Sequence, residues 1–573
     1  MDLLQGEKFL WKLPEDNKHL ALELASSCSL SVPIAQTLAS RGFATKDEIE
    51  DFLFSTFEKD VFDSLLMKDL KKSVNRILKA IKNKEKILVF GDYDVDGITS
   101  SAMMVICLLD LGAKINFYLP NRVRDGYGIS TKIVERAAKN NYTVIITVDN
   151  GIAAFEAAKK AKELGIDLII TDHHQPHGKL PDAFAVVDPS RKDCKYPFKK
   201  LAGVGVAFKL ISFLYEKKGL ELPPKAYEFL LLGTIADVVP LVGENRFWVR
   251  HGLNYVNKTE SYPLSVLKRN SKFAKPSLSS NDIGYFITPQ INALGRLEDP
   301  RQGVKFLIGS EKREVDEVGR ILFELNQARK EIERSIFKEI KEEIDKKNID
   351  LDKENIIIAA SRSWSPGVIG LVASRLVSAY GRPALLFHLD KNGLAKGSCR
   401  SIKEFNIFEA LKKSRDIIKK FGGHACAAGL SLPVDNVPKL KEKLEKMIAE
   451  ELTEFDLKQK IVLDAEARLS DLNKKFITDM DLLEPFGNHN VQPSFYFKNV
   501  VQVQKPVLLK DEHVKCNVFA DGVIKPIIFF CRPELFKTLL ERGEEPFDVA
   551  ANVAQNYWNG RVNIELIGLD ISI

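Results

Sequence analysis

Three aspartates stand close together in the segment GDYDVDG, where Asp92, Asp94 and Asp96 follow the apolar run KILVF. In extended backbone, residues two positions apart face the same side, so we expect these three carboxylates to point together. Carboxylates held on one side repel one another unless a cation neutralises them. The spacing therefore predicts a metal site, against the simpler interpretation of an aspartate-rich turn.

Two later apolar runs also end in residues that bind metals. TVIITV is followed by Asp149, and DLIIT by Asp172, His173 and His174. Asp237 follows the apolar stretch LLGTIA, where an unpaired buried carboxylate would be costly, so we expect a cation or a donor beside it. Mixed imidazole and carboxylate ligands suit manganese, zinc or magnesium, with manganese favoured. The number of carboxylates suggests two ions, and a two-metal site favours phosphoester hydrolysis.

The apolar runs that precede these residues alternate with helical stretches such as AAFEAAKKAKELG. Strands alternating with helices predict a doubly wound parallel sheet. In such a sheet, ligands bind outside the carboxyl ends of the strands. The acids and histidines that follow the strands are therefore expected to meet in one crevice.

The chain of 573 residues is too long for a single hydrophobic core, so we expect an α/β multidomain protein. The charged stretch near residue 330 has apolar residues at helical spacing, and a solvated connecting helix is preferred there over a coiled-coil partner site. Short β-like segments near the C-terminus predict a small barrel. The expected divisions are a helical segment at 1–75, the parallel-sheet domain at 76–309, a connecting helix at 310–350, a second α/β domain at 351–455 and the barrel at 456–573.

Composition narrows the class of protein. The net charge of +6 is a weak lean toward a polyanionic partner, because dense DNA binders are more basic. The seven cysteines contain no CxxC pair, which indicates a reducing cytosol and a cytoplasmic protein. No stretch reaches the roughly 18 apolar residues of a membrane span, and the N-terminus does not read as a secretory signal.

The sequence resembles the DHH phosphoesterase superfamily, which is named for the triplet that stands here at residues 172–174. Within it, the chain is similar over nearly its whole length to the bacterial single-strand-specific exonucleases. That resemblance rests on blocks in the same order: GDYDVDGITS, PNRVRDGYGIS, ITVDNGI, ITDHH, ADVVPLVGENR, QINALGRLEDP, SWSPGVIGLVASRL, KGSCRS and FGGHACAAG.

The resemblance implies an exonuclease that removes nucleotides from single-stranded DNA in the 5′→3′ direction, in DNA repair and recombination. Two divalent ions would serve it, with Mn²⁺ preferred and Mg²⁺ possible. The implied metal ligands are Asp92, Asp94, Asp96, Asp149, His173 and Asp237. Asp149 would bridge both ions, His174 would contact the scissile phosphate, and Asp172 would orient the histidines.

The resemblance also implies contacts to the substrate. Guanidinium groups fit phosphate bidentately, which agrees with the arginines among them. The implied contacts are Arg122, Arg296, Ser398, Arg400 and His424, of which Ser398 and Arg400 would hold the 5′-terminal phosphate. The expected partners are single-stranded DNA and, as candidates, a single-strand-binding protein and a helicase. The protein is expected to act as a monomer without a membrane.

Two positions depart from the family pattern. Ser365 stands where the family usually has histidine, and PFGNHNVQP (485–493) replaces the usual PFGxGNPxP. In the barrel, Tyr557 and Trp558 would stack on bases or pack in the core. Since all implied ligands precede residue 240 and all implied phosphate contacts except His424 precede residue 405, we expect the chemistry to need nothing after about residue 455.

Two other functions are open to a protein of the DHH superfamily. A small-substrate phosphodiesterase of the same superfamily would act on dinucleotides or cyclic dinucleotides, but such enzymes are usually shorter and lack the terminal barrel. A catalytically inactive scaffold in a replication complex would typically have lost metal ligands, and here every matched acid is present.

Overall fold

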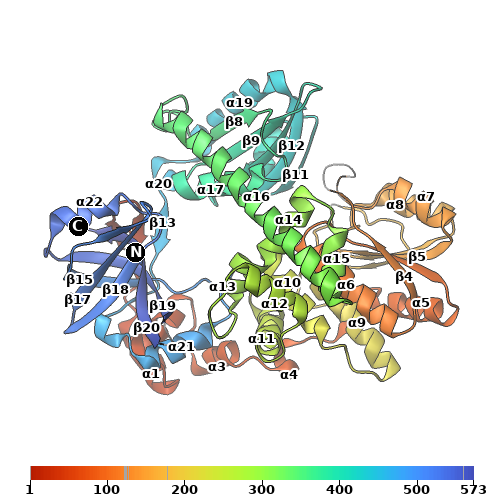
Figure 1. The fold of residues 1–573 in the computed structure, drawn as a ribbon, viewed down its shortest axis with the longest axis horizontal. Helices are drawn as coiled ribbons and strands as arrows, with labels where there is room; N and C mark the ends of the chain where they lie inside the picture. The colour runs from red at the N-terminus through yellow and green to blue at the C-terminus, as the bar shows by residue number, and fades with distance from the viewer. Residues whose placement is uncertain (1, 122–125, 127, 177, 559–560) are drawn as a thin grey trace. The chain divides into compact units, whose positions relative to one another are not determined.

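The structure, a computed structural model, describes residues 2–121, 126, 128–176, 178–558 and 561–573, with residues 557, 558 and 561 described by their backbone alone. The chain forms two compact units, each described by itself here (Figure 1). The first, called the acidic unit because aspartates follow several of its strands, comprises residues 45–326 and 478–492. The composite unit comprises residues 1–44, 327–477 and 493–573.

A five-stranded sheet forms the centre of the acidic unit, with the strand order β4-β3-β5-β6-β7. All neighbouring strands pair in parallel, which confirms the predicted doubly wound sheet. The strands are β3 (Lys86–Phe90), β4 (Lys114–Tyr118), β5 (Tyr142–Val148), β6 (Asp167–Thr171) and β7 (Ala185–Val187).

Both faces of this sheet are buried. Ile87 and Val89 of β3 pack into one apolar cluster, whereas Leu88 and Phe90 pack into a second cluster on the opposite face. Helices α6 (Val95–Asp110) and α9 (Gly203–Lys218) supply the first cluster, and helices α7 (Thr131–Lys139) and α8 (Phe155–Glu163) supply the second. Strands covered on both faces are continuous apolar runs, which is why they were visible in the sequence.

Further helices complete the acidic unit. They are α3 (Lys46–Leu53), α4 (Phe57–Asp60), η1 (Ser64–Leu66), α5 (Leu70–Lys82), α10 (Lys225–Ala236), α11 (Gly243–Lys258), α12 (Tyr262–Asn270), α13 (Ser280–Asp282), the π-helical turn η2 (Ile283–Ile287), α14 (Thr288–Leu297) and α15 (Arg301–Ile308). The apolar residues of α5, α10, α11, α12, η2, α14 and α15 continue the first cluster of the sheet.

The segment 478–492 belongs to the acidic unit although it follows the second α/β domain in the chain. Arg246 of α11 is buried and donates hydrogen bonds to the carbonyls of Leu483 (2.8 Å), Leu482 (3.1 Å) and Phe52 (3.1 Å). The sequence expectation placed this segment in the barrel domain. It lies here because the carbonyls at the end of helix α21 (Lys474–Leu483) need donors, and Arg246 supplies them.

The predicted second α/β domain contains a five-stranded sheet with the order β11-β12-β10-β9-β8. Only β8 and β9 among these strands pair in parallel. Helix α17 (Ile369–Tyr380) contacts β9 and β10. The elements are β8 (Ile357–Ser361), β9 (Ala384–Leu389), β10 (Leu394–Arg400), β11 (Lys420–His424), β12 (Ala427–Pro433), α18 (Ile407–Lys413), η3 (Val434–Asn436) and α19 (Val437–Glu451).

The C-terminal part of the composite unit is a closed barrel, as predicted. Strand β15 pairs with β19 on one side and with β17 on the other, and this closes a ring of five strands. The ring consists of β15 (Phe495–Gln502), β17 (His513–Ala520), β18 (Val523–Phe529), β19 (Phe547–Trp558) and β20 (Arg561–Ser572), accompanied by β14 (Ala465–Glu466), β16 (Val507–Leu509), η4 (Leu469–Asp471) and α22 (Leu535–Arg542).

The N-terminal segment differs from the sequence expectation. Two strands, β1 (Leu3–Gln5) and β2 (Leu10–Lys12), precede helices α1 (Lys18–Ser27) and α2 (Val32–Ser40), and β2 pairs in parallel with β13 (Lys460–Val462). The buried Trp11 indole donates to Asp570 at 3.1 Å. Three-residue strands are too short to show a two-residue period, and their partner lies far along the chain.

The charged stretch expected to be a connecting helix forms helix α16 (Lys312–Asp345). A short helix, α20 (Glu454–Leu457), comes directly after α19 in the chain. Throughout the described part of the chain, no helix combines the length and the apolar composition needed to cross a bilayer.

Candidate metal centre

The carboxyl ends of three neighbouring strands bring acidic side chains together. Asp92 follows β3, Asp149 follows β5 and Asp172 follows β6, and these strands are adjacent in the sheet. Asp149 has a backbone φ of +61°, and a side-chain carbon at Gly203 would lie 2.6 Å from the Asp149 Cβ. Glycine at position 203 is therefore what allows helix α9 to approach the strand end this closely.

The expectation that residues 92–96 are extended throughout is wrong for the second half of the segment. Helix α6 begins at Val95, and the Asp94 side chain caps it by accepting the Gly97 N–H at 3.1 Å. Asp96 therefore lies in the first turn of the helix. Its carboxylate accepts the backbone N–H groups of Gly203 (2.6 Å) and Val204 (2.7 Å) at the start of α9.

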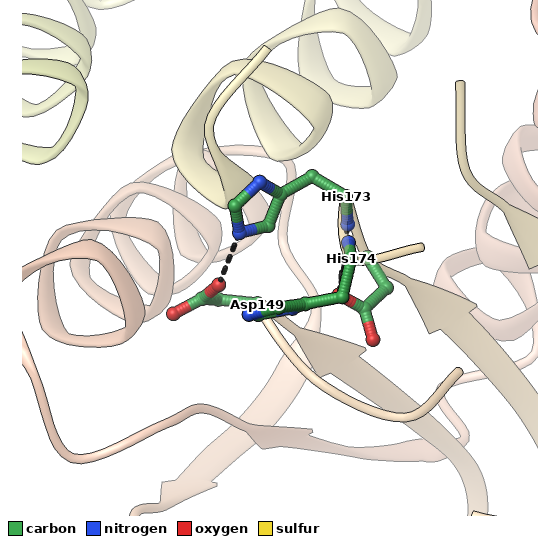
Figure 2. Close-up of side chains that lie close together, drawn as sticks. Asp149, His173 and His174 are labelled. Atoms are coloured by element: carbon green, nitrogen blue, oxygen red, sulfur yellow. Dashed lines mark hydrogen bonds and ion pairs between the residues drawn. The ribbon is translucent and has the colours of Figure 1, made fainter. Parts of the chain in front are cut away.

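The His173 ring points toward the Asp149 carboxylate, as Figure 2 shows. Its Nε2 atom is 3.2 Å from Asp149 Oδ1, 3.7 Å from Asp237 Oδ2 and 4.0 Å from Asp96 Oδ2. Candidate ligand atoms within 4.8 Å of one another form three overlapping groups: Asp92, Asp94 and Asp149; Asp96, His173 and Asp237; and Asp149, Asp172, His173 and His174. The structure thus brings all six predicted metal ligands into connected groups.

Asp172 lies within one of these groups, and its carboxylate hydrogen-bonds the neighbouring backbone and the His174 ring. It accepts the backbone N–H groups of Ile152 (2.8 Å), His173 (2.8 Å) and His174 (3.1 Å), and its Oδ1 lies 2.7 Å from His174 Nδ1. Burial disfavours the charged imidazole, but the hydrogen bond and charge of Asp172 outweigh burial and raise the pKa of His174 to about 9. This arrangement fixes His174 as a cation with a defined ring orientation.

Three other carboxylates, those of Asp96, Asp149 and Asp237, are poorly stabilised as anions. Burial, followed by the charge of Asp94, raises the pKa of Asp96 to about 7. Burial and neighbouring carboxylates, Asp96 first, also raise the pKa values of Asp149 and Asp237 well above their usual range. Among the described residues, no group hydrogen-bonds the buried Asp237 Oδ2. Such a set of buried oxygen atoms and one imidazole fits divalent cations, which would supply the missing positive charge.

Sequence reasoning missed the backbone donors at Gly203 and Val204. The only local signal was the pair of glycines in LAGVGVA, inside an otherwise apolar run. These two N–H groups keep the Asp96 carboxylate in one orientation and place the positive end of the α9 dipole beside it.

The predicted phosphate contacts lie in different places. Arg296 is half-buried in the last turn of α14, where a side chain at Gly295 would lie 2.1 Å from the Tyr93 carbonyl. Arg296 is therefore next to the segment that carries Asp92 and Asp94. Arg122 lies outside the described residues, as do the side chains of Tyr557 and Trp558.

Ser398, Arg400 and His424 gather at one end of the second sheet. Arg400 and His424 flank Ala427 on neighbouring strands, and Arg400 Nη1 lies 3.3 Å from Ser398 Oγ. A side chain at Gly370 would lie 2.7 Å from Ser398 Oγ, so the first turn of α17 abuts these residues. An arginine, a hydroxyl and a helix N-terminus together suit an anion such as a phosphate.

The strand order, the DHH triplet and the cluster of carboxylates define a metal-dependent phosphoesterase of the DHH class. The profile of the DHH family, N-terminal domain, matches residues 86–234. The DHHA1 domain profile matches residues 353–450, and the RecJ OB domain profile matches residues 463–570. The three matches cover the parallel-sheet domain, the second α/β domain and the barrel.

The chain belongs to the RecJ family and is a metal-dependent nuclease. It is 35% identical over 570 residues to the single-stranded-DNA-specific exonuclease RecJ of Bacillus subtilis, covering 99% of this chain and 71% of that protein. The RecJ of Escherichia coli is 33% identical over 506 residues, covering 84% and 85%. The crystal structure of Thermus thermophilus RecJ in complex with Mn²⁺ matches with a TM-score of 0.82 and 26% identity, covering 98% of this chain and 79% of that one.

Proposed function

We propose that this protein is a 5′→3′ exonuclease that hydrolyses single-stranded DNA with two divalent metal ions, in DNA repair and recombination. The observation that carries the proposal is the position of Asp149, which shares one group of ligand atoms with Asp92 and Asp94 and lies 3.2 Å from His173, a member of the second group. A carboxylate common to two groups of ligands is the arrangement that a bridging ligand requires. The relatives named as single-stranded-DNA-specific exonucleases support the substrate.

In this proposal, Asp92 and Asp94 would hold one ion, His173 and Asp237 the other, and Asp149 both, with Asp96 beside them. When bound, two such ions activate water and stabilise the charge that develops on the phosphate oxygens. Water adds to phosphorus, the P–O3′ bond breaks, and the phosphate remains on the shortened strand as its new 5′ end.

His174 and Asp172 have a different task in this mechanism. Because Asp172 engages Nδ1 at 2.7 Å, the contact of His174 to the scissile phosphate would be made through Nε2. Burial lowers the pKa of His174, but the hydrogen bond and charge of Asp172 outweigh it, raise the pKa to about 9 and so favour the protonated ring. A protonated imidazole is an electrostatic partner for a phosphate whose negative charge increases during the reaction.

Ser398, Arg400 and His424 would bind the 5′-terminal phosphate, and Arg296 and Arg122 would bind phosphates near the scissile bond. Each round of hydrolysis leaves a new 5′ phosphate, so the group recognised is regenerated in every cycle. The barrel would hold the strand further along, as oligonucleotide-binding barrels do through basic grooves and base stacking.

Several finer features belong to the same proposal. We place the functional divisions at 76–309 for hydrolysis, 351–455 for the 5′ end and 456–573, apart from residues 478–492, for the strand. Manganese is preferred over magnesium; the RecJ of Thermus thermophilus has been crystallised with each. The enzyme acts as a monomer in the cytoplasm, with a single-strand-binding protein and a helicase as partners.

The test is digestion of a long single strand labelled at its 5′ or its 3′ end, with Mn²⁺, Mg²⁺ or EDTA. We expect early release of the 5′ label as a mononucleotide, with Mn²⁺ giving the higher rate, and no release in EDTA. Early release of the 3′ label would contradict the polarity. Internal cuts or equal digestion of duplex DNA would contradict the exonuclease and its specificity.

A further inference from the structure

The backbone directly after Asp237 has an unusual conformation. Asp237 ends helix α10, and the next residue, Val238, has a φ of +58°. This left-handed region is unfavourable for L-residues and especially for β-branched ones. A conformation of this kind persists only where the surrounding structure determines it, and such positions concentrate at functional sites.

Asn488 supplies that surrounding structure from the segment 478–492. Its side-chain Nδ2 donates to the Val238 carbonyl at 2.7 Å, and its backbone carbonyl accepts the Leu241 N–H at 2.8 Å. Asn488 therefore holds both ends of the turn 238–241. Gly487 packs against the same turn, because a side chain there would lie 2.7 Å from Leu241 Cδ1.

The segment that carries Asn488 is itself fixed. The buried Asn490 side chain donates to the carbonyls of Leu483 (2.8 Å) and Pro485 (2.9 Å), and the backbones of Gly487 and Asn490 exchange two hydrogen bonds. The Phe486 carbonyl accepts the hydroxyl of Ser280 at 2.7 Å. A rigid segment can hold the turn, whereas a loosely attached one would move with it.

We propose that Asn488 is a positioning residue for the metal ligand Asp237, acting through the Val238 carbonyl. The proposal rests on the proposed function in taking Asp237 as a metal ligand. No described group hydrogen-bonds Asp237 Oδ2, so the direction of this carboxylate depends on the backbone that follows it. Releasing Val238 from its left-handed conformation would rotate that backbone and turn the carboxylate away from His173.

The family departure at PFGNHNVQP is explained by the same segment. His489 has a φ of +62° at the position where the family usually has glycine, and Asn490 retains the buried hydrogen bonds of the turn. Histidine in place of glycine at residue 489 raises the conformational free energy of forming this turn, because glycine adopts a positive φ more readily.

The test is calorimetric titration of metal-free full-length protein with MnCl₂, which needs no nuclease activity. We expect Asn488→Ala and Asn488→Asp to weaken Mn²⁺ affinity by about 10–100-fold, the usual effect of losing an outer-shell partner of a metal site. Binding of a single strand in EDTA should remain unchanged. Asn436→Ala is the matched control, because Asn436 of the composite unit also donates Nδ2 to a backbone carbonyl, that of Ile417 at 3.1 Å.

A second variant tests the route of the effect. Val238→Gly removes the conformational penalty, so the double variant Val238→Gly/Asn488→Ala should recover much of the lost affinity. Wild-type affinity in both Asn488 variants, or a lower melting temperature without weaker Mn²⁺ binding, would overturn the proposal. Failure of the double variant to recover would also overturn it. If the wild type binds Mn²⁺ but does not degrade single strands, the proposed function fails and the positioning role survives.

Discussion

The metal-free protein is expected to lose stability as the pH rises from about 4 to about 7. Burial and the charge of Asp94 raise the pKa of Asp96 from 3.8 to about 7. Between these two values the folded protein keeps a proton that the unfolded chain has released, so the free energy of unfolding falls with increasing pH. At about 1.4 kcal/mol per pKa unit, this carboxyl alone accounts for a loss of about 4 kcal/mol. Asp149 and Asp237 are shifted in the same direction.

Scanning calorimetry at several pH values measures this loss. The transition of the acidic unit is identified as the one that Mn²⁺ shifts. A loss of about 4 kcal/mol corresponds to a fall of roughly 10 °C in the melting temperature of a unit of this size. Because metal binding displaces the retained protons, added Mn²⁺ should stabilise more at pH 8 than at pH 5. Asp96→Asn should flatten the pH dependence of the metal-free protein.

Two results would refute this reasoning. One is a metal-free protein whose melting temperature is constant or rises between pH 4 and 7. The other is an equal stabilisation by Mn²⁺ at pH 5 and at pH 8. Either result would mean that the carboxylates are already stabilised as anions by the protein alone, and the argument that they require cations would fail.

Four further outcomes are expected. Asp149→Ala should lower the rate of hydrolysis by several orders of magnitude with the fold intact by circular dichroism, and more than a tenth of wild-type activity at saturating Mn²⁺ would exclude the bridging role. Arg400→Ala should reduce the preference for 5′-phosphorylated over 5′-hydroxyl strands by about 1.5–3 kcal/mol, and an unchanged ratio of rates would place the pocket elsewhere. Arg246→Met should destabilise the acidic unit by at least about 3 kcal/mol in urea unfolding, because buried carbonyls lose their donors; a change under 1 kcal/mol would count against this account. A chain ending near residue 455 should bind Mn²⁺ at least about 10-fold more weakly than the full chain, and equal affinity would show that residues 478–492 are dispensable.

The position of the metal centre could be predicted because its information is local. Each of Asp92, Asp149 and Asp172 directly follows a buried strand, and the parallel order of those strands brings their carboxyl ends to one edge. Asp237 was recognisable as a carboxylate at the end of an apolar run. None of these inferences needed knowledge of which distant segments pack together.

The contacts that orient the ligands could not be predicted, because they join segments far apart in the chain. The N–H groups that hold Asp96 come from Gly203 and Val204, and nothing in GDYDVDG identifies that partner. Strand β2 likewise depends on β13, which follows the whole second α/β domain. Hydrophobic periodicity reports which face of an element is buried and says nothing of what covers it.

The division of the chain explains why a tail that carries no metal ligand still contributes to the metal centre. Residues 327–477 and 493–573 belong to one unit, whereas residues 478–492 between them return to the acidic unit. All six predicted ligands precede residue 240, yet the turn after Asp237 is held by Asn488 and the buried Arg246 binds carbonyls at 482 and 483. Closing so long a loop costs little more entropy than closing a moderate one, and the hydrogen bonds of the buried Arg246 to this segment offset the difference. On the proposed positioning role of Asn488, the complete metal centre requires the chain through residue 490, and a boundary chosen from the ligands alone would divide the acidic unit.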